Sequence, residues 1–245
     1  MHRSSLVPSL LILAFLLAFQ PIEAAFAARS QQSQKKAPAA RTQPAGKKDA
    51  SLSTSAEQLQ KGAAAYESGD FNSARLILKP LAEKGDDNAG FAMGLMAARG
   101  EGGQQNFKEA ERWWTSSAAS GNPLSQFNLG LLHYTGALGK KNFVKAREFW
   151  SAAVKQKQPD AFYGMGVLLV NGAEGVPKDV AAGVRNFEQA ASFGHPMAEL
   201  ELGNAYRAGE GVKKDRKKAM DYYKKAAAKG LSEAQSALES MDAEK

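Results

Sequence analysis

Hydrophobic and polar positions repeat with a constant period along residues 89–233. Four blocks align, and they begin at Ala89, Ser125, Ala161 and Ala198, so that their starts lie 36, 36 and 37 residues apart. Each block holds an apolar stretch, a glycine-rich turn and a second, amphipathic stretch. A fixed period of this length indicates a repeat architecture in which each block is one supersecondary unit.

Glycines and capping residues at fixed register positions predict where the helices pack and where they end. A glycine inside the apolar stretch is costly unless another helix approaches closely, and a glycine six residues later is placed to end that helix. An Asn or Asp then caps the second helix, and a small contact residue follows four positions on. In chain order these are the packing glycines Gly94, Gly130, Gly166 and Gly203, the stop glycines Gly100, Gly136, Gly172 and Gly209, the caps Asn106, Asn142, Asp179 and Asp215, and the contact residues Ala110, Ala146, Gly183 and Ala219.

The chain on both sides of the four blocks extends the array. Residues 56–88 keep the cap, contact and stop spacings at Asp70, Ala74 and Gly85, and we interpret them as a divergent first repeat. Residues 234–245 supply only a polar first helix, which suits the cap of an open-ended stack. We therefore predict an all-α fold, an α-solenoid with the form of a right-handed superhelix. It has about five helix-turn-helix repeats, 56–88, 89–124, 125–160, 161–197 and 198–233, and a C-terminal capping helix, 234–245.

The last block carries a family resemblance. From Ala198 to Gly230 it has the pattern A-x-x-x-L-G-x-x-Y-x-x-G-x-G-V-x-x-D-x-x-x-A-x-x-Y-Y-x-x-A-A-x-x-G. This pattern resembles the Sel-one-like repeat, a relative of the tetratricopeptide repeat, and the resemblance covers residues 56–245. The second and third repeats depart from it, with Ala97 and His133 in the first tyrosine position. The resemblance implies a solenoid whose concave face binds a protein or a peptide.

A second apolar stripe runs along the first helices, three residues before and one and four residues after each packing glycine. At about 100° per residue, these groove positions lie roughly 150° from the stripe that packs the hairpin. Two interpretations stay open: neighbouring first helices cover them, or they line a groove in which aromatic anchors such as Phe127, Tyr134 and Tyr163 hold a protein partner. The candidate partner-binding residues are Phe91, Leu95, Phe127, Leu131, Tyr134, Tyr163, Val167, Asn204 and Arg207.

Aromatic pairs follow the contact residue in three repeats, at 113–114, 149–150 and 222–223. A cofactor-stacking motif would not recur in register with the fold. Because such rings bury a large apolar area, the pairs indicate packing between stacked hairpins.

No residue pattern in the chain indicates catalysis. The sequence has no cysteine, no P-loop, no nucleophile elbow and no zinc-type ligand spacing. His133 occupies a packing position and is expected to be half-buried, whereas His195, in the turn FGHPM, is expected to be exposed. We therefore predict a protein that is not an enzyme, with no catalytic residue, no cofactor and no metal site.

The N-terminal region has the layout of an export signal. His2 and Arg3 precede an apolar run, and the small-residue site at 25–27 follows, so we expect a signal peptide over residues 1–27. The apolar run is shorter than the roughly 20 residues of a membrane span, and no transmembrane segment is expected after cleavage. Residues 28–55 are rich in Gln, Ala, Ser, Pro and Lys and are expected to be a disordered basic linker. The mature protein is then periplasmic or secreted.

Most of the positive charge lies in that linker. The chain has a formal net charge of +7, and residues 28–55 hold six bases against one acid, which leaves +2 for residues 56–245. Lysines of the last repeat fill positions outside its packing stripe: Lys213, Lys214, Lys217, Lys218, Lys224 and Lys225.

Two functions stay open. The first is an exported scaffold or adaptor that binds an envelope or secreted protein in the groove of the solenoid. The alternative is a protein that binds a polyanion or an envelope surface through residues 28–55 and the last repeat, by an attraction that weakens with salt. Specific nucleic-acid binding is not expected.

Overall fold

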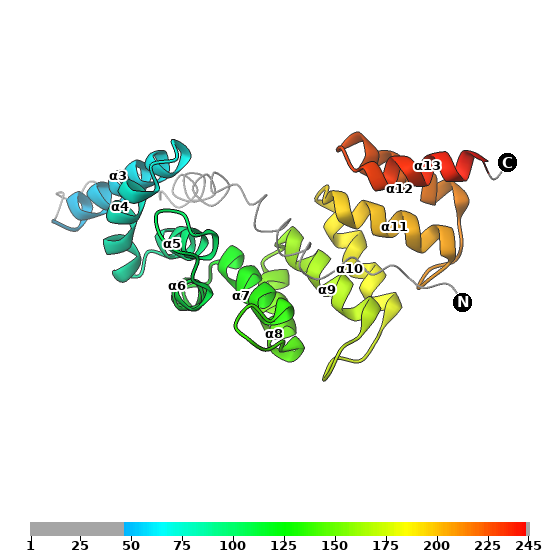
Figure 1. Cartoon of the computed structure of the whole chain (residues 1–245), viewed down its shortest axis with the longest axis horizontal. Coiled ribbons are helices and arrows are strands. Elements are labelled where there is room, and N and C mark those ends of the chain that lie inside the picture. The colour runs from blue at the N-terminus through cyan, green and yellow to red at the C-terminus, as the bar shows by residue number, and fades with distance from the viewer. Residues whose placement is uncertain (1–46, 244–245) are drawn as a thin grey trace, which may run out of the picture. The chain divides into compact units, whose positions relative to one another are not determined.

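A computed structural model describes the backbone of residues 47–243 and the side chains of residues 55–243. This part of the chain is all-helical, as predicted, and contains no β-strand. It divides at Lys140 and Lys141 into two compact units, the first with α3–α7 and the second with α8–α13 (Figure 1). The helices are α3 (Lys47–Glu67), α4 (Phe71–Glu83), α5 (Asp87–Arg99), α6 (Phe107–Ala119), α7 (Pro123–Thr135), α8 (Phe143–Lys155), α9 (Pro159–Asn171), α10 (Val180–Ser192), α11 (Pro196–Ala208), α12 (Arg216–Ala228) and α13 (Ser232–Ala243).

The N-terminal boundary differs from the expected one. The signal peptide predicted over residues 1–27 and the linker up to residue 46 lie outside the described residues. The predicted disordered linker extends to residue 55, but α3 begins at Lys47, so the prediction is wrong for residues 47–55. Once the packed part of a helix has formed, each added residue gains a backbone hydrogen bond without a new nucleation cost, and the helix extends into sequence of low apolar content.

The predicted N-caps are confirmed. Asp70, Asn106, Asn142, Asp179 and Asp215 each accept a hydrogen bond from the backbone N–H three residues later, over 2.8–3.1 Å. Each bond satisfies one of the amides that the first turn of a helix leaves without an intrahelical partner. The divergent first repeat therefore begins its second helix, α4, in the same way as the other repeats.

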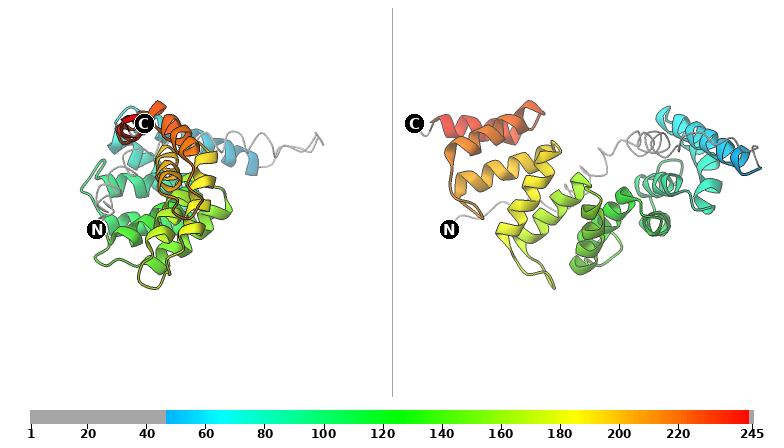
Figure 2. Two further views of the ribbon diagram at one scale, coloured as in Figure 1. Left: turned by 90° about the vertical axis from the view of Figure 1, so that its right-hand side faces the viewer. Right: turned by 180° about the vertical axis from the view of Figure 1, so that it is seen from behind.

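The first helices end at the predicted glycines. Gly100, Gly136 and Gly209 have left-handed backbone conformations, with φ of 74–79°. Gly172 has φ 65° but an extended ψ of 164°, because the turn after α9 contains the extra residue of this repeat. In that turn, which extends beyond the ends of α9 and α10 (Figure 2), Ala173 and Val176 form an isolated antiparallel bridge.

The packing glycines lie under large side chains of the second helix in the same hairpin. A Cβ atom at Gly94 would lie 2.4 Å from the indole of Trp114, and a Cβ at Gly203 would lie 2.4 Å from the ring of Tyr223. Real Cβ contacts are never this short, so the helices can approach to this distance only with glycine at these positions. The prediction of close helix approach is confirmed for these two hairpins.

Two further hairpins, α3–α4 and α9–α10, use the same contact. Phe187 lies against Gly166, and in the first repeat Leu78 lies against Gly62, where an added Cβ would be 2.5 Å from each side chain. The second member of each aromatic pair is the more deeply buried one, since Trp114, Trp150 and Tyr223 are at most 2% exposed and Trp113 is 5% exposed. Core packing by these rings is therefore confirmed.

Within each unit, helices contact their neighbours along the chain. Within the second unit, α11 packs on α10 and α12, and α13 covers α12 (Figure 1). Polar contacts between repeats join residues 33–35 positions apart, about one repeat, as nearest-neighbour coupling requires. They are Tyr66 to Glu101, Arg75 to Glu109, Arg207 to Ser240 and Lys229 to the carbonyl of Gly194.

The Gly203→Ala variant should be destabilised. The added methyl group must displace the buried Tyr223 ring, which costs about 1–3 kcal/mol and outweighs a gain of about 1 kcal/mol in helix propensity. Gly103→Ala is the matched control, because nothing lies within 4 Å of a Cβ at that position. Urea unfolding should show a lower midpoint for the first variant only; equal midpoints would contradict the packing assignment.

The Lys157→Gly variant should be stabilised. Lys157 ends α8 with a φ of 62° and is the only non-glycine residue with positive φ in the described part of the chain. A left-handed conformation costs an L-residue about 1–2 kcal/mol, of which the extra freedom of glycine in the unfolded chain removes part, so we expect a net gain of about 0.5–1 kcal/mol in the free energy of unfolding. Lys155→Gly, at a position inside α8, should instead lower the free energy of unfolding. A lower urea midpoint for Lys157→Gly would overturn this prediction.

Candidate functional site

Most of the candidate groove residues are part of the core. Phe91, Leu95, Phe127 and Leu131 are at most 1% exposed, and Tyr163 is 5% exposed. A helix that is apolar on two sides can be buried on both, and α5 contacts both α6 and α7. The interpretation that these positions are covered therefore holds for these five residues. They are too buried in this structure to anchor a partner.

The remaining groove positions keep accessible surface. Tyr134 on α7 and Val167 on α9 are half-buried, and burial raises the pKa of the Tyr134 hydroxyl. On α11, Asn204 is exposed and its Oδ1 accepts a hydrogen bond from the Tyr223 hydroxyl at 2.8 Å. Arg207, half-buried, donates to Oγ of Ser240 on α13 at 3.1 Å. Asn204 and Arg207 are thus polar groove positions of α11, and both form hydrogen bonds with later helices.

His195 is not exposed, contrary to the sequence prediction. Its side chain is 8% exposed and its ring stacks on Tyr163, with centroids 4.6 Å apart. Nδ1 accepts a hydrogen bond from the backbone N–H of Ala198, so that His195 is the N-cap of α11. This bond places the neutral-ring proton on Nε2, which lies 3.4 Å from Oδ1 of Asp160.

The cap role could have been found from sequence. Proline favours the first position of a helix, so the residue before it is a candidate N-cap. Pro196 follows His195 just as Pro123 follows Asn122, and Asn122 caps α7 by accepting from the N–H of Ser125. The other histidine, His133, is 8% exposed, somewhat more buried than expected.

An ion pair between an exposed lysine and a buried carboxylate lies beside this cap. Lys229, at the end of α12, donates to Oε1 of Glu199 at 2.6 Å and to the carbonyl oxygen of Gly194 at 2.9 Å. The Glu199 carboxylate is 4% exposed, and its second oxygen has no hydrogen-bond partner among the described residues. Because removal of one partner would leave a buried charge uncompensated, Lys229 fixes the end of α12 to the α10–α11 turn.

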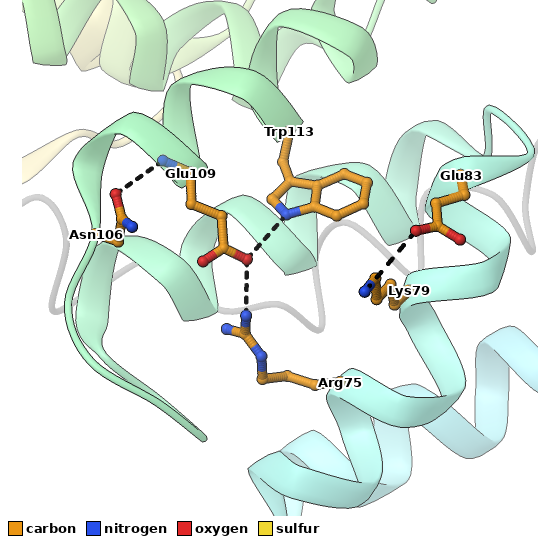
Figure 3. Close-up of polar contacts among 6 residues, drawn as sticks. All are labelled: Arg75, Lys79, Glu83, Asn106, Glu109 and Trp113. Carbon is orange, nitrogen blue, oxygen red and sulfur yellow. Dashed lines mark hydrogen bonds and ion pairs between the residues drawn. The ribbon is translucent and has the colours of Figure 1, made fainter.

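Two polar clusters join the first two repeats. In Figure 3, Glu109 of α6 receives hydrogen bonds from Arg75 of α4, at 2.7 Å, and from the indole N–H of Trp113, at 3.3 Å. In the second cluster the Tyr66 hydroxyl donates to Glu101 and accepts from Arg99. Burial, followed by the bond to Glu101, raises the pKa of the Tyr66 hydroxyl. Both clusters join neighbouring repeats and have a structural role.

Stacked tyrosines on α11 and α12 form a feature that the sequence did not predict. The rings of Tyr206 and Tyr222 stack with centroids 5.8 Å apart and planes 9° from parallel. Lys218 Nζ lies 5.0 Å from the centroid of Tyr206, and Lys225 Nζ lies 5.2 Å from that of Tyr222. Burial raises the pKa of the Tyr222 hydroxyl, and the nearby Tyr206 hydroxyl adds to the shift. Hydrophobic periodicity indicates which face of a single helix is buried, whereas this stack forms between residues of two helices.

Neither a metal centre nor a membrane span occurs in residues 47–243. No three His, Asp or Glu side chains of this range are placed to hold a metal ion. None of its helices combines the length and the hydropathy that crossing a membrane requires.

The repeated helix-turn-helix units define a helical-repeat protein of the α-solenoid class. The Sel1 repeat family model matches residues 89–122, 123–157, 159–195 and 196–231, which is more than half of the chain. The chain belongs to the Sel1 repeat family, the Sel-one-like repeat of the sequence pattern.

Solved structures support this assignment. The chain is 30% identical to a Sel1 repeat protein from Oxalobacter formigenes, with a TM-score of 0.68 over 76% of this chain and 55% of that one. It is 27% identical to a protective antigen with an SLR fold from uropathogenic Escherichia coli, with a TM-score of 0.53 over 77% and 49%. The chain thus spans about half the length of these two relatives. No curated protein matched.

Loss of the His195 side chain should destabilise the α9–α11 contact. The His195→Ala variant loses the N-cap of α11 and the stack on Tyr163, which should lower the free energy of unfolding by about 1–2 kcal/mol. His195→Asn is the matched variant, because Asn can still accept from the N–H of Ala198, as Asn122 does at the equivalent position. In urea unfolding, His195→Asn should lower the free energy of unfolding less than His195→Ala does. An equal decrease for both variants would show that the cap contributes nothing.

Proposed function

We propose that this Sel1 repeat chain is an exported scaffold or adaptor without enzymatic activity, which binds a protein or peptide partner. The proposal rests on one observation: the buried side chains of the described repeats are occupied by packing within and between repeats. Buried rings, helix caps and ion pairs of the described repeats serve contacts within a hairpin or to the next one. Side chains with accessible surface are then left for recognition of a partner, as in extended helical-repeat surfaces. Because the chain spans only about half the length of these two relatives, their own partners do not define the partner of this chain.

The partner-binding surface that we propose is narrower than the predicted groove. It consists of the accessible groove positions of the second unit: Val167, Asn204 and Arg207. They combine an apolar contact, an amide and a guanidinium, and arginine is enriched among the residues that dominate binding energy. Tyr134 lies in the first unit and is a separate candidate contact.

The proposed organisation of the chain includes a cleaved leader. Residues 1–27 direct export, residues 28–46 form a basic linker, and the pair α3–α4 is a divergent first repeat. Support comes from the apolar run that ends at a small-residue cleavage site, and from the shared cap at Asp70.

Export predicts a defined mature N-terminus. The full chain, expressed in a bacterium, should be recovered from the periplasm or the medium as a protein that begins at Ala28, measured by intact mass. A chain that keeps residues 1–27 and stays with the cytoplasmic fraction would contradict the export proposal.

Site-specific photocrosslinking tests the binding surface. A photoreactive amino acid at position 167 or 204 should give covalent adducts with one partner protein in cells that export the chain. The same amino acid at Lys145 or Lys155, exposed positions on α8, is the control and should give none. Adducts from the control positions alone would place the partner elsewhere and overturn the surface assignment.

A further inference from the structure

Positive charge is concentrated at one end of the array. Residues 209–230 contain eight lysines and arginines against three acids, Glu210, Asp215 and Asp221. Lys229 pairs with Glu199, whereas the other six lysines of this stretch, all of them exposed, have no acid within ion-pair distance among the described residues. These six lysines and the stacked tyrosines form the Lys–Tyr face: Lys213, Lys214, Lys217, Lys218, Lys224, Lys225, Tyr206 and Tyr222.

Some cations elsewhere in the described repeats have acidic partners, since Arg75 pairs with Glu109 and Arg99 with Glu101. Within the last repeat, Lys229 pairs with Glu199. Like charges that are held close together repel one another and destabilise the folded state. On the Lys–Tyr face the exposed Asp221, three or four residues from each lysine of α12, offsets part of this repulsion, and a bound anionic partner would relieve the rest.

The two tyrosines hold part of this charge in place. Lys218 and Lys225 lie over the rings of Tyr206 and Tyr222, and each cation is attracted by the electron-rich face of its ring. The Tyr206 hydroxyl lies 3.4 Å from Oε1 of Glu188 on α10, which ties the stack to the neighbouring repeat. Two ammonium groups are therefore positioned at the surface before any partner binds.

The geometry of α12 fits a flat partner. Its buried residues Ala219, Tyr223 and Ala226 lie on one side, and Lys217, Lys218, Lys224 and Lys225 are exposed on the other. The two lysine pairs are seven residues apart, which is about 10 Å along a helix. An exposed helix face with spaced ammonium groups can contact many anionic headgroups at once.

We infer that the Lys–Tyr face docks on a lipid bilayer that carries anionic phospholipid. The apolar side of α12 is packed in the core and is not available for insertion between acyl chains, so the attachment is electrostatic and peripheral. This site is separate from the proposed partner surface of Val167, Asn204 and Arg207, and attachment at a membrane would leave that surface to its protein partner.

Vesicle binding tests this inference. The full chain is mixed with vesicles of phosphatidylglycerol and phosphatidylcholine in equal parts, and bound protein is measured by sedimentation. Substitution of Lys217, Lys218, Lys224 and Lys225 by Gln should lower the affinity about tenfold or more, since each lysine near an anionic surface contributes separately. Binding should also fall between about 50 mM and about 500 mM NaCl, because salt screens the attraction.

A matched variant controls for net charge. Substitution by Gln of four other exposed lysines, Lys84, Lys108, Lys145 and Lys155, removes the same charge and should change the affinity less than about twofold. Circular dichroism checks that both variants are folded. As a readout on the unmutated chain, vesicles should protect Lys217 and Lys224 from acetylation but not Lys145.

Three outcomes would overturn the inference. Equal losses in the two variants would show a general charge effect. Equal binding to vesicles of phosphatidylcholine alone would show that anionic lipid is not recognised. Binding of soluble polyglutamate that depends on the Lys–Tyr face, without binding to vesicles, would assign the face to an acidic protein segment instead.

Discussion

Contact between a glycine of the first helix and a large side chain of the second helix is the interaction on which the rest of the structure depends. Trp114 on Gly94, Phe187 on Gly166 and Tyr223 on Gly203 bring the two helices of each hairpin close together. At Gly166 the approach is so close that the opposite residue is also a glycine, Gly183, whose added Cβ would lie 2.9 Å from the carbonyl oxygen of Gly166. The caps and turns fix where each helix starts and stops, so that these three rings meet their glycines in register.

Because the buried side chains are occupied by packing, only accessible side chains can bind a partner. The groove positions of α5 are apolar and buried, whereas two of those in α11, Asn204 and Arg207, are polar and accessible. The same end of the array carries the Lys–Tyr face. Repeats built on one packing rule therefore differ in the residues they present to solvent, and these differences are where recognition of a protein or a membrane surface can arise.

The sequence predicted features that depend on local register and missed those that depend on two helices together. The caps at Asn106 and Asp215 and the stops at Gly100 and Gly209 need only the neighbouring backbone, and all were found. Burial of Phe127 and the stack of Tyr206 on Tyr222 depend on tertiary packing, which periodicity does not report. The turn that contains His195 has the composition of a loop between helices, which predicts an exposed side chain. Pro196, however, marks the first residue of α11, and this makes His195 the N-cap.

The most direct test of this account is a double-mutant cycle between Gly203 and Tyr223, measured by urea unfolding. Removal of the ring in Tyr223→Ala opens space for the methyl group that Gly203→Ala adds. The account predicts that Gly203→Ala costs less in the Tyr223→Ala background than in the original chain, with a coupling energy of about 1–3 kcal/mol. Equal costs of Gly203→Ala in the two backgrounds would contradict the claim that the ring on the glycine sets the packing of the hairpin.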